Sequence, residues 1–179
     1  FFRKFNVNVK EVQQAYTLNL FLRGGVEAAS AMWYNEYHSI ISAGINPDEL
    51  TCFFMSDYGK EFPEDGVYCL EKTWKLDPES CRDFARASVE GWIYAFDHPA
   101  ESLDIVMKYV EEAKIKTSRT HQKWMLERMK DIILKSGKSA MGRLDPGDYA
   151  ATAGELKANG LIKTIPSFND FHVDAISRD

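Results

Sequence analysis

Five consecutive side chains within residues 28–40 are the best candidates for chemistry in this sequence. Small residues lead directly into Trp33, Tyr34, Asn35, Glu36 and Tyr37. Flat rings can stack on a flat ligand, while a neighbouring amide and carboxylate bind the polar edge of that ligand. The same rings could instead fill a core, and Glu36 would then be a solvated acid at the start of a helix. Both interpretations stay open at this point.

Further candidates lie where other predicted strands end. In open α/β sheets, ligands bind beyond the carboxyl ends of the strands. Tyr16 and Thr17 precede a predicted helix whose first amides could hold an anionic or carbonyl group. Tyr58 follows a predicted strand at 50–55. The candidate ligand-binding residues are therefore Tyr16, Thr17, Trp33, Tyr34, Asn35, Glu36 and Tyr58.

Strand geometry limits how many of these side chains can face one ligand. Alternation would send Trp33 and Asn35 to one side of a strand and Tyr34 and Glu36 to the other. All of them can line one cavity only if the backbone turns within the segment.

The sequence lacks the usual patterns of catalysis. Its four histidines are far apart, with no H-x-x-x-H pair and no adjacent cysteine, so we expect no metal site. No G-x-S-x-G turn or G-x-G-x-x-G occurs, and SGKSA at 136–140 has Ile132 where a phosphate loop needs glycine. Glu64 and Asp65 lie in a turn-rich loop, where solvation explains them. We therefore expect no enzyme, no metal and no cofactor.

The first half of the chain alternates strand-like and helix-like pieces. Predicted strands cover 8–15, 28–34, 50–55 and 66–74, and predicted helices cover 18–25 and 36–44. Asn46, Pro47 and Glu49 form a capping-box signal for a further helical start. The opening FFRKFNVNV is typical of the end of an amphipathic helix, which suggests a piece of a longer protein.

The second half is predicted to be helical. After Asp77 and Pro78, apolar residues recur with the helical period at Cys81, Phe84, Ala85, Val89, Trp92, Ile93 and Phe96. His98 and Pro99 end this helix and begin the next, a third contains Trp124, and a fourth begins at Asp145 and Pro146. Such stripes face a core. The sequence thus predicts an α/β part of a binding lobe at 1–76 and a helical part at 77–179 that packs on its sheet.

The net charge, the length of the apolar runs and the spacing of the cysteines argue against several classes of protein. A net charge of −5, with no basic face, argues against a nucleic-acid partner. No apolar run approaches the ~20 residues that span a bilayer. Cys52, Cys69 and Cys81 are irregularly spaced; Cys52 and Cys69 could pair if their strands were neighbours, but buried free thiols are the favoured interpretation.

Three segments carry a family resemblance. They resemble segments of the NMT/THI-like family, and they are FLRGGVEAASAMWYNEYHSIISAGI at 21–45, SVEGWIYAFDHPAESLDIVMKYV at 88–110 and GRLDPGDYAATAGELKANGLIKTIPSFNDF at 142–171. That family includes the solute-binding components of ABC importers for thiamine-precursor pyrimidines. The resemblance covers most of the chain from about Phe5 onward.

The resemblance implies a fold and a function. The fold would be type II periplasmic-binding-protein-like, with this chain supplying the end of the second lobe and a helical return to the first. The function would be binding of a small planar heteroaromatic ligand for an ABC permease, in the periplasm or elsewhere outside the cytoplasm. Glu36 would accept from the ligand's amino group, and its neighbours Trp33, Tyr34 and Asn35 match the place of the family's aromatic wall, with Tyr58 a looser match.

Other functions stay open within the same resemblance. Some members of the family are enzymes that build the pyrimidine from pyridoxal phosphate, but their cysteine-rich motif is absent from this sequence. A ligand-sensing domain of a regulator is a third possibility. A chain that lacks one lobe would also expose apolar surface, so we expect some self-association.

Overall fold

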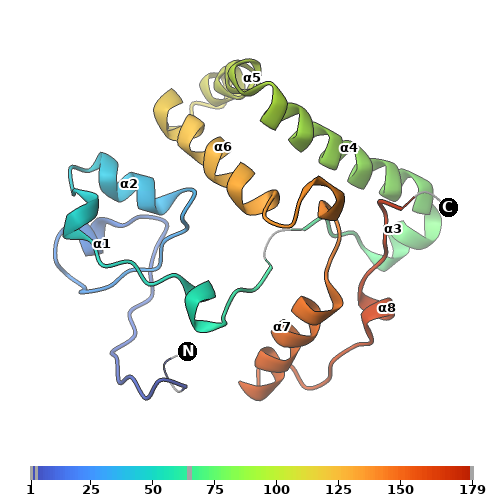
Figure 1. The fold of residues 1–179 in the computed structure, drawn as a ribbon, viewed down its shortest axis with the longest axis horizontal. Helices are drawn as coiled ribbons and strands as arrows, with labels where there is room; N and C mark the ends of the chain where they lie inside the picture. The colour runs from blue at the N-terminus through green and yellow to red at the C-terminus, as the bar shows by residue number, and fades with distance from the viewer. Residues whose placement is uncertain (1, 3, 64–65, 178–179) are drawn as a thin grey trace. The chain divides into compact units, whose positions relative to one another are not determined.

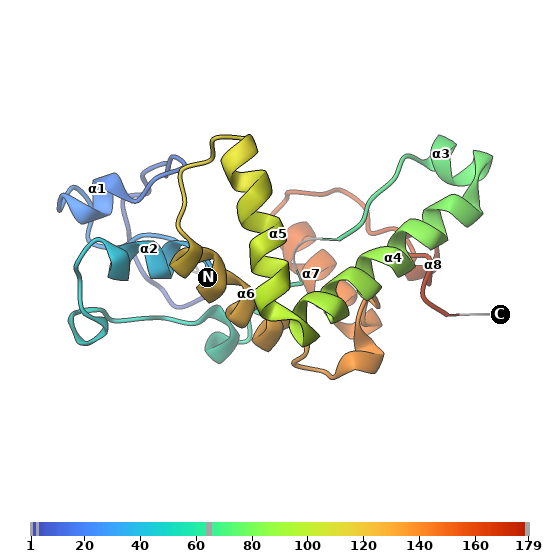
Figure 2. The ribbon, with the colours of Figure 1, turned by 90° about the horizontal axis from the view of Figure 1, so that it is seen from above.

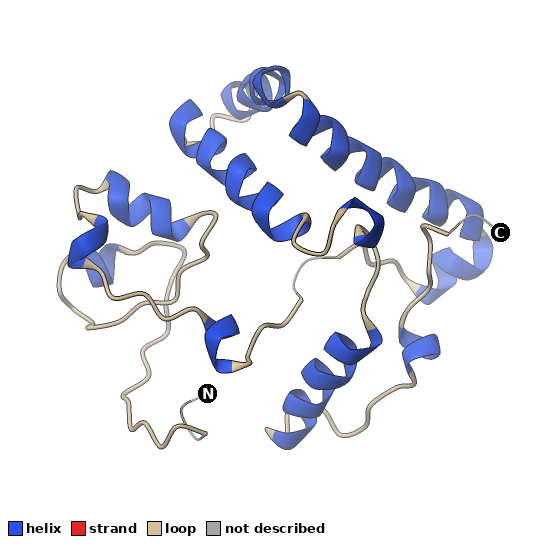
Figure 3. Ribbon diagram, in the orientation of Figure 1, coloured by secondary structure: helices blue, strands red, loops and turns tan. Residues whose placement is uncertain are grey.

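The computed structural model describes residues 2, 4–63 and 66–177, and all regular structure among them is helical (Figure 3). The α-helices are α1 (Asn19–Leu22), α2 (Glu36–Ser42), α3 (Glu71–Leu76), α4 (Pro78–Asp97), α5 (Pro99–Glu112), α6 (Arg119–Ile133), α7 (Pro146–Ala158) and α8 (Phe168–Phe171). Three short 3-10 helices are η1 (Pro47–Glu49), η2 (Met55–Tyr58) and η3 (Lys138–Ala140). The acidic pair Glu64 and Asp65 and part of the N-terminal segment lie outside the described residues.

The α/β fold class predicted from the sequence is wrong, because the described residues contain no strand. The expected sheet of a type II periplasmic-binding lobe is therefore not seen. High β propensity reflects a fit to a half-buried pleated surface, and these segments have no such surface beside them. Phe53, Tyr68 and Leu70 keep 63%, 78% and 75% of their area exposed.

One expected strand is partly a helix. Residues 71–76 form α3, in which Glu71 and Lys75 make an i,i+4 ion pair on the helix surface. Another pair of expected strands, 8–15 and 28–34, is linked by the side chain of Gln14. Its amide donates to Ser30 O (2.9 Å) and accepts from Ser30 N–H (3.1 Å), which imitates one step of a strand ladder.

Several sequence signals for helix ends are confirmed. Asn46 and Glu49 form the predicted capping box at η1, and Gly44 (φ +99°) follows the end of α2. Asp145 caps α7, because its Oδ1 accepts from the Gly147 N–H (2.7 Å) and the Asp148 N–H (3.1 Å). None of the described helices combines the length and the hydropathy needed to cross a bilayer.

The chain divides into two compact units, and each is described here by itself. Unit 1 comprises Phe1–Lys60 and His98–Ile132, and unit 2 comprises Glu61–Asp97 and Ile133–Asp179. The boundary at residues 76 and 77 stays a prediction. In unit 1, α6 lies beside α2 in both ribbon views (Figures 1 and 2), and Leu18, Ile40 and Leu103 are its buried apolar residues.

Unit 2 contains α3, α4, α7 and α8. Helix α3 packs against α4, where the guanidinium of Arg82 lies over the ring of Trp74 at 4.9 Å. The expected core-facing stripe of α4 is only partly correct, since Phe96 is buried but Phe84 is 63% exposed. In the second part of unit 2, the Tyr149 ring packs on α8, with its centroid 5.0 Å from that of Phe171.

The cysteines are free thiols, and the expectation that they are buried is wrong for two of them. Cys52 and Cys69 are exposed, and only Cys81 is half-buried. Burial raises the pKa of the Cys81 thiol, and its hydrogen bond with Cys69 raises that pKa further.

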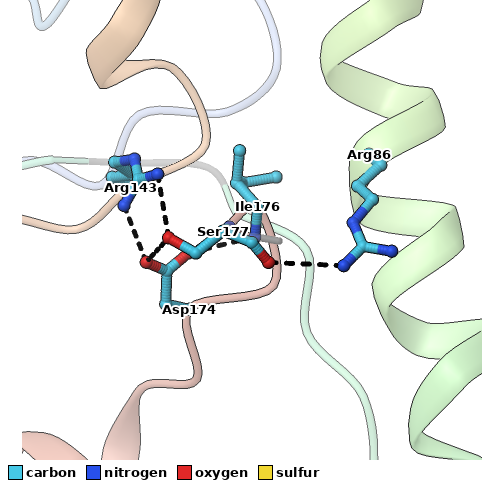
Figure 4. Close-up of polar contacts among 5 residues, drawn as sticks. All are labelled: Arg86, Arg143, Asp174, Ile176 and Ser177. Carbon is cyan, nitrogen blue, oxygen red and sulfur yellow. Dashed lines mark hydrogen bonds and ion pairs between the residues drawn. The ribbon is translucent and has the colours of Figure 1, made fainter. Parts of the chain in front are cut away.

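The C-terminal segment is held by a polar clasp, which we define as Arg86, Arg143, Asp174 and Ser177 (Figure 4). Arg143 donates to Asp174 Oδ2 (2.7 Å) and to Ser177 Oγ (3.0 Å), while Arg86 donates to Ser177 O (3.3 Å). Hydrogen bonds from the Ser177 hydroxyl and backbone lower the pKa of Asp174 to about 2, with smaller help from Arg143. The clasp ties residues 174–177 to α4 and to the turn before α7.

The turn beside the clasp requires glycine. Gly142 has φ +71°, and a Cβ at this position would lie 2.8 Å from a methyl group of Val89 and 2.9 Å from Ile176 Cγ1. Any larger residue would therefore push the C-terminal segment away from α4.

Candidate functional site

The backbone turns within the aromatic segment, as the pocket interpretation requires. Residues 33–35 form a turn and α2 begins at Glu36, so the alternation of a strand does not apply here. The Glu36 carboxylate folds back onto its own chain, where Oε2 accepts from Met32 N–H (3.0 Å) and Oε1 accepts from Asn35 Nδ2 (3.1 Å). A carboxylate in the first turn of a helix is also favoured by the helix dipole. Glu36 thus fixes the start of α2 and the amide of Asn35 together.

Helix α6 supplies the other side of this region. The indole Nε1–H of Trp124 donates to Trp33 O at 3.1 Å. One turn earlier on α6, His121 reaches the Asn35 side chain, with 2.9 Å between Nε2 and Oδ1. Positions three residues apart share a helix face, so both contacts come from the same side of α6.

The aromatic side chains pack on one another. Ring centroids lie 4.4 Å apart for Trp33 and Tyr37, 5.7 Å apart for Trp33 and Trp124, and 6.0 Å apart for Tyr37 and Trp124. Two further side chains contact Trp124, since His38 stacks on its ring at 5.1 Å and Arg128 lies over the same ring at 4.8 Å. These rings therefore pack on one another in the structure, as the packing interpretation expects. They support the neighbouring polar residues of α2 and α6.

Four side chains form a continuous hydrogen-bonded chain, which we call the polar chain: His38, His121, Asn35 and Glu36. The two imidazoles meet through their Nδ1 atoms at 2.9 Å, and His121 Nε2 then meets Asn35 Oδ1 at 2.9 Å. An ionised Glu36 can only accept, so the Asn35 nitrogen must face it and the Asn35 oxygen must face His121. His121 consequently carries its hydrogen on Nε2, and a neutral His121 accepts from His38 at Nδ1.

Burial lowers the pKa of His121, and a charge on His38 would lower it further, whereas Glu36 acts in the opposite direction. The neutral form of His121 is thus favoured at neutral pH. That form is the one that the direction of the polar chain requires.

The polar chain borders an open groove of about 650 Å³ within unit 1. The groove is lined by Asn35, Ser39, Ser42, Ala43, Ile115, Lys116, Thr117, Ser118, His121, Gln122 and Met125. One wall is therefore α2, and the other is the start of α6 with the segment before it. Amides and hydroxyls come from Asn35, Gln122 and the serine and threonine residues, and Met125, Ile115 and Ala43 supply apolar contact.

The structure brings some of the predicted site residues together. Asn35 lines the groove, Glu36 is half-buried and holds the Asn35 amide by a hydrogen bond, and Trp33 is half-buried in the same turn. Tyr34 is half-buried in the same turn and is not among the lining residues. A ligand-binding role for each of these residues stays a prediction.

The remaining candidates lie apart from the groove lining. Tyr16 and Thr17 are exposed, and α1, which follows them, is only four residues long. Tyr58 is half-buried in η2, where its ring meets Phe5 edge-on with the centroids 5.5 Å apart. Their roles in binding also stay predictions.

Sequence reasoning missed the contribution of α6. His121, Gln122 and Met125 line the groove, and Trp124 supports it, yet all four were assigned to a core stripe or left without a role. The spacing of His121, Trp124 and Arg128 along one helix face was the available signal. No described group of three or more histidine, cysteine, aspartate or glutamate side chains has an arrangement that could hold a metal ion.

The comparison with protein families gives the class of this protein. The family model described as NMT1/THI5 like matches residues 3–102, which is more than half of the 179-residue chain. The chain belongs to the NMT1/THI5-like family. Membership supports a role in binding or biosynthesis of the kind found in this family, acting on a small molecule. No curated protein and no solved structure matches the chain.

The matched range covers one wall of the groove. Helix α2, with Asn35 and Glu36, lies inside residues 3–102, whereas α6 and its His121 lie beyond residue 102. The family match therefore bears on the aromatic segment, and the pairing of that segment with α6 comes from the structure.

Proposed function

We propose that this protein binds a small planar heteroaromatic molecule in the groove between α2 and α6, and that it does so without chemical conversion of the ligand. The observation that carries the proposal is the Asn35 amide, which is held in one orientation by Glu36 and His121 at the groove wall. A polar group fixed before the ligand arrives costs less to order on binding.

The remaining hydrogen-bonding capacity of the Asn35 side chain indicates which edge of a ligand would face it. Glu36 uses one hydrogen of the amide nitrogen and His121 uses one lone pair of the oxygen, which leaves one hydrogen and one lone pair of the amide for a ligand. An aminopyrimidine presents the complementary pair, an amino group next to a ring nitrogen. Proteins use the same amide pattern to bind the amino group and ring nitrogen of adenine.

The size and lining of the groove suit such a ligand. Ligand pockets have volumes of roughly 300–1,000 Å³ and combine apolar walls with a few polar groups, and the groove has about 650 Å³. Met125 and Ile115 would contact the faces of the ring, while Gln122 and the hydroxyls of Ser39 and Ser42 would take polar substituents. Two hydrogen bonds at Asn35 would contribute about 0.5–1.5 kcal/mol each.

The wider role follows from the family. We propose that the bound molecule is a thiamine-precursor pyrimidine or a related compound, and that the protein delivers it to an ABC permease outside the cytoplasm. NMT1/THI5-like membership supports this role, as does the resemblance of residues 21–45 to the importer proteins.

Calorimetry with 4-aminopyrimidine as the probe tests the proposal, with unsubstituted pyrimidine as the matched ligand. Asn35→Ala should weaken binding of 4-aminopyrimidine by about 5- to 150-fold, since it removes about 1–3 kcal/mol of hydrogen bonding. Asn159→Ala, at the C-cap of α7 in unit 2, is the matched control and should leave the affinity unchanged.

Two results would contradict the proposal. Equal affinity of the wild type and Asn35→Ala would remove Asn35 from the site. Mass spectrometry of the recovered probe, and of pyridoxal phosphate incubated with the protein, should show both unchanged. A new product would instead favour the biosynthetic role of the family.

A further inference from the structure

The contact between His38 and His121 restricts where protons can reside. Their Nδ1 atoms lie 2.9 Å apart and their ring centroids 5.0 Å apart. A hydrogen bond at this distance needs one Nδ1 with a hydrogen and one without. While the contact persists, only one of the two rings can carry a hydrogen on Nδ1.

We propose that this contact makes ligand binding in the groove dependent on pH, with His38 acting as a positioning residue through His121 on Asn35. The inference rests on the proposed function of the groove. Its content is the regulation of that site: the ligand is held near neutral pH and released in acid.

The first added proton leaves the polar chain intact. It binds Nε2 of His38, and the Nδ1–H of His38 continues to donate to His121. The second proton must go to Nδ1 of His121, and two N–H groups then point at each other across 2.9 Å. The imidazolium rings must then separate, and we infer that His121 moves as they do, which takes its Nε2–H away from Asn35 Oδ1. The two histidines therefore titrate as a pair, with the second step as the releasing one.

The charged groups around the pair set the pH of that step. On α2, the Glu36 carboxylate favours protonation of His121. The cations Lys116, in the segment before α6, and Arg128, stacked on Trp124, oppose it. The α5 residue Asp104 is paired with Arg119 of α6. Burial of His121 also disfavours its protonation, so the pKa of the second step lies below the ordinary value of a histidine.

Nuclear magnetic resonance of the ring nitrogens tests the contact in the wild-type protein without any ligand. Near neutral pH, His121 should be the Nε2–H tautomer and His38 the Nδ1–H tautomer. On acidification, the two should titrate in two coupled steps, and the Asn35 side-chain amide signal should shift at the second. His172, which stacks on Phe168 in unit 2, serves as the reference signal.

Calorimetry with 4-aminopyrimidine between about pH 8 and pH 5 tests the consequence for binding. Wild-type affinity should fall about tenfold for each pH unit below the second step, because one extra proton opposes binding. His38→Asn cannot gain a charge at this position, so the ratio of its affinity near neutral pH to its affinity in acid should be smaller than the wild-type ratio; protonation of the ring nitrogen of the probe itself affects both proteins alike. His172→Asn should keep the wild-type profile.

The outcomes separate the two proposals. Identical pH profiles for the wild type and His38→Asn would overturn the role of His38 while leaving the groove as a binding site. A probe that binds at no pH would reject the proposed function. The Asn35 amide signal would then decide the pH inference. A shift at the second histidine step would support it, and no shift would overturn it. Circular dichroism of each variant checks that it is folded.

Discussion

Replacing Trp124 by phenylalanine should loosen the region that supports the groove. The change removes the indole N–H that donates to Trp33 O, a hydrogen bond worth about 0.5–1.5 kcal/mol, and leaves that half-buried carbonyl without its donor. It also weakens the stacking with Arg128, which contributes about 0.5–1 kcal/mol at an exposed site. Phenylalanine keeps most of the contacts with Trp33 and Tyr37. The expected loss is therefore about 2 kcal/mol in the local stability of α2 and α6.

Hydrogen exchange measured by mass spectrometry can locate this loss. A change of about 2 kcal/mol should speed exchange of the α6 amides about 25-fold, given that about 1.4 kcal/mol is a factor of ten. Trp92→Phe is the matched control, because Trp92 lies on α4 in unit 2 and is 38% exposed. Surface substitutions of this kind change stability by only about 0.5 kcal/mol. Equal exchange of α6 in the two variants would refute the supporting role of Trp124.

Three further substitutions test other parts of the structure. Glu36→Gln leaves one oxygen for two donors, so we expect about tenfold weaker binding of 4-aminopyrimidine by calorimetry, and unchanged affinity would contradict the role of Glu36 in fixing Asn35. Gly142→Ala should destabilise unit 2 by about 1–3 kcal/mol in urea denaturation, because a Cβ would meet side-chain carbons at 3.0 Å or less, and a neutral effect would show that the turn is not tightly packed. The lowered pKa of Asp174 means that its contribution to stability is present above its unfolded pKa and is lost as the pH falls from about 4 towards about 2. Asp174→Asn should remove that part of the acid dependence, and an identical acid profile would argue against the hydrogen bonds from Ser177.

The sequence predicted local helix signals well because they depend on nearby residues. Asp145 with Pro146 starts α7, and Pro99 begins α5, as their capping and φ preferences require. The strands failed for the opposite reason, since a strand exists only beside a partner that the sequence does not identify. Residues 66–74 illustrate this, because without a neighbouring strand their second half becomes α3.

The candidate site was half predictable for the same reason. The aromatic segment at Trp33 stood out by composition and a helix was predicted to begin at Glu36, whereas the turn at 33–35 lies where a strand was expected. Its pairing with α6 joins residues 83 to 91 positions apart, as in the contacts of His38 with His121 and of Trp33 with Trp124. No periodicity or motif within one sequence encodes such a pairing. The same separation along the chain explains why the contact between His38 and His121 could not be predicted from the sequence.

Nuclear magnetic resonance titration of the side-chain amides with 4-aminopyrimidine tests the central claim most directly. The account predicts saturable shifts of the Asn35 amide and of the Nε2–H signal of His121, at a common dissociation constant, with the Asn159 amide unmoved. Shifts confined to other residues, or no saturable change at Asn35, would contradict it.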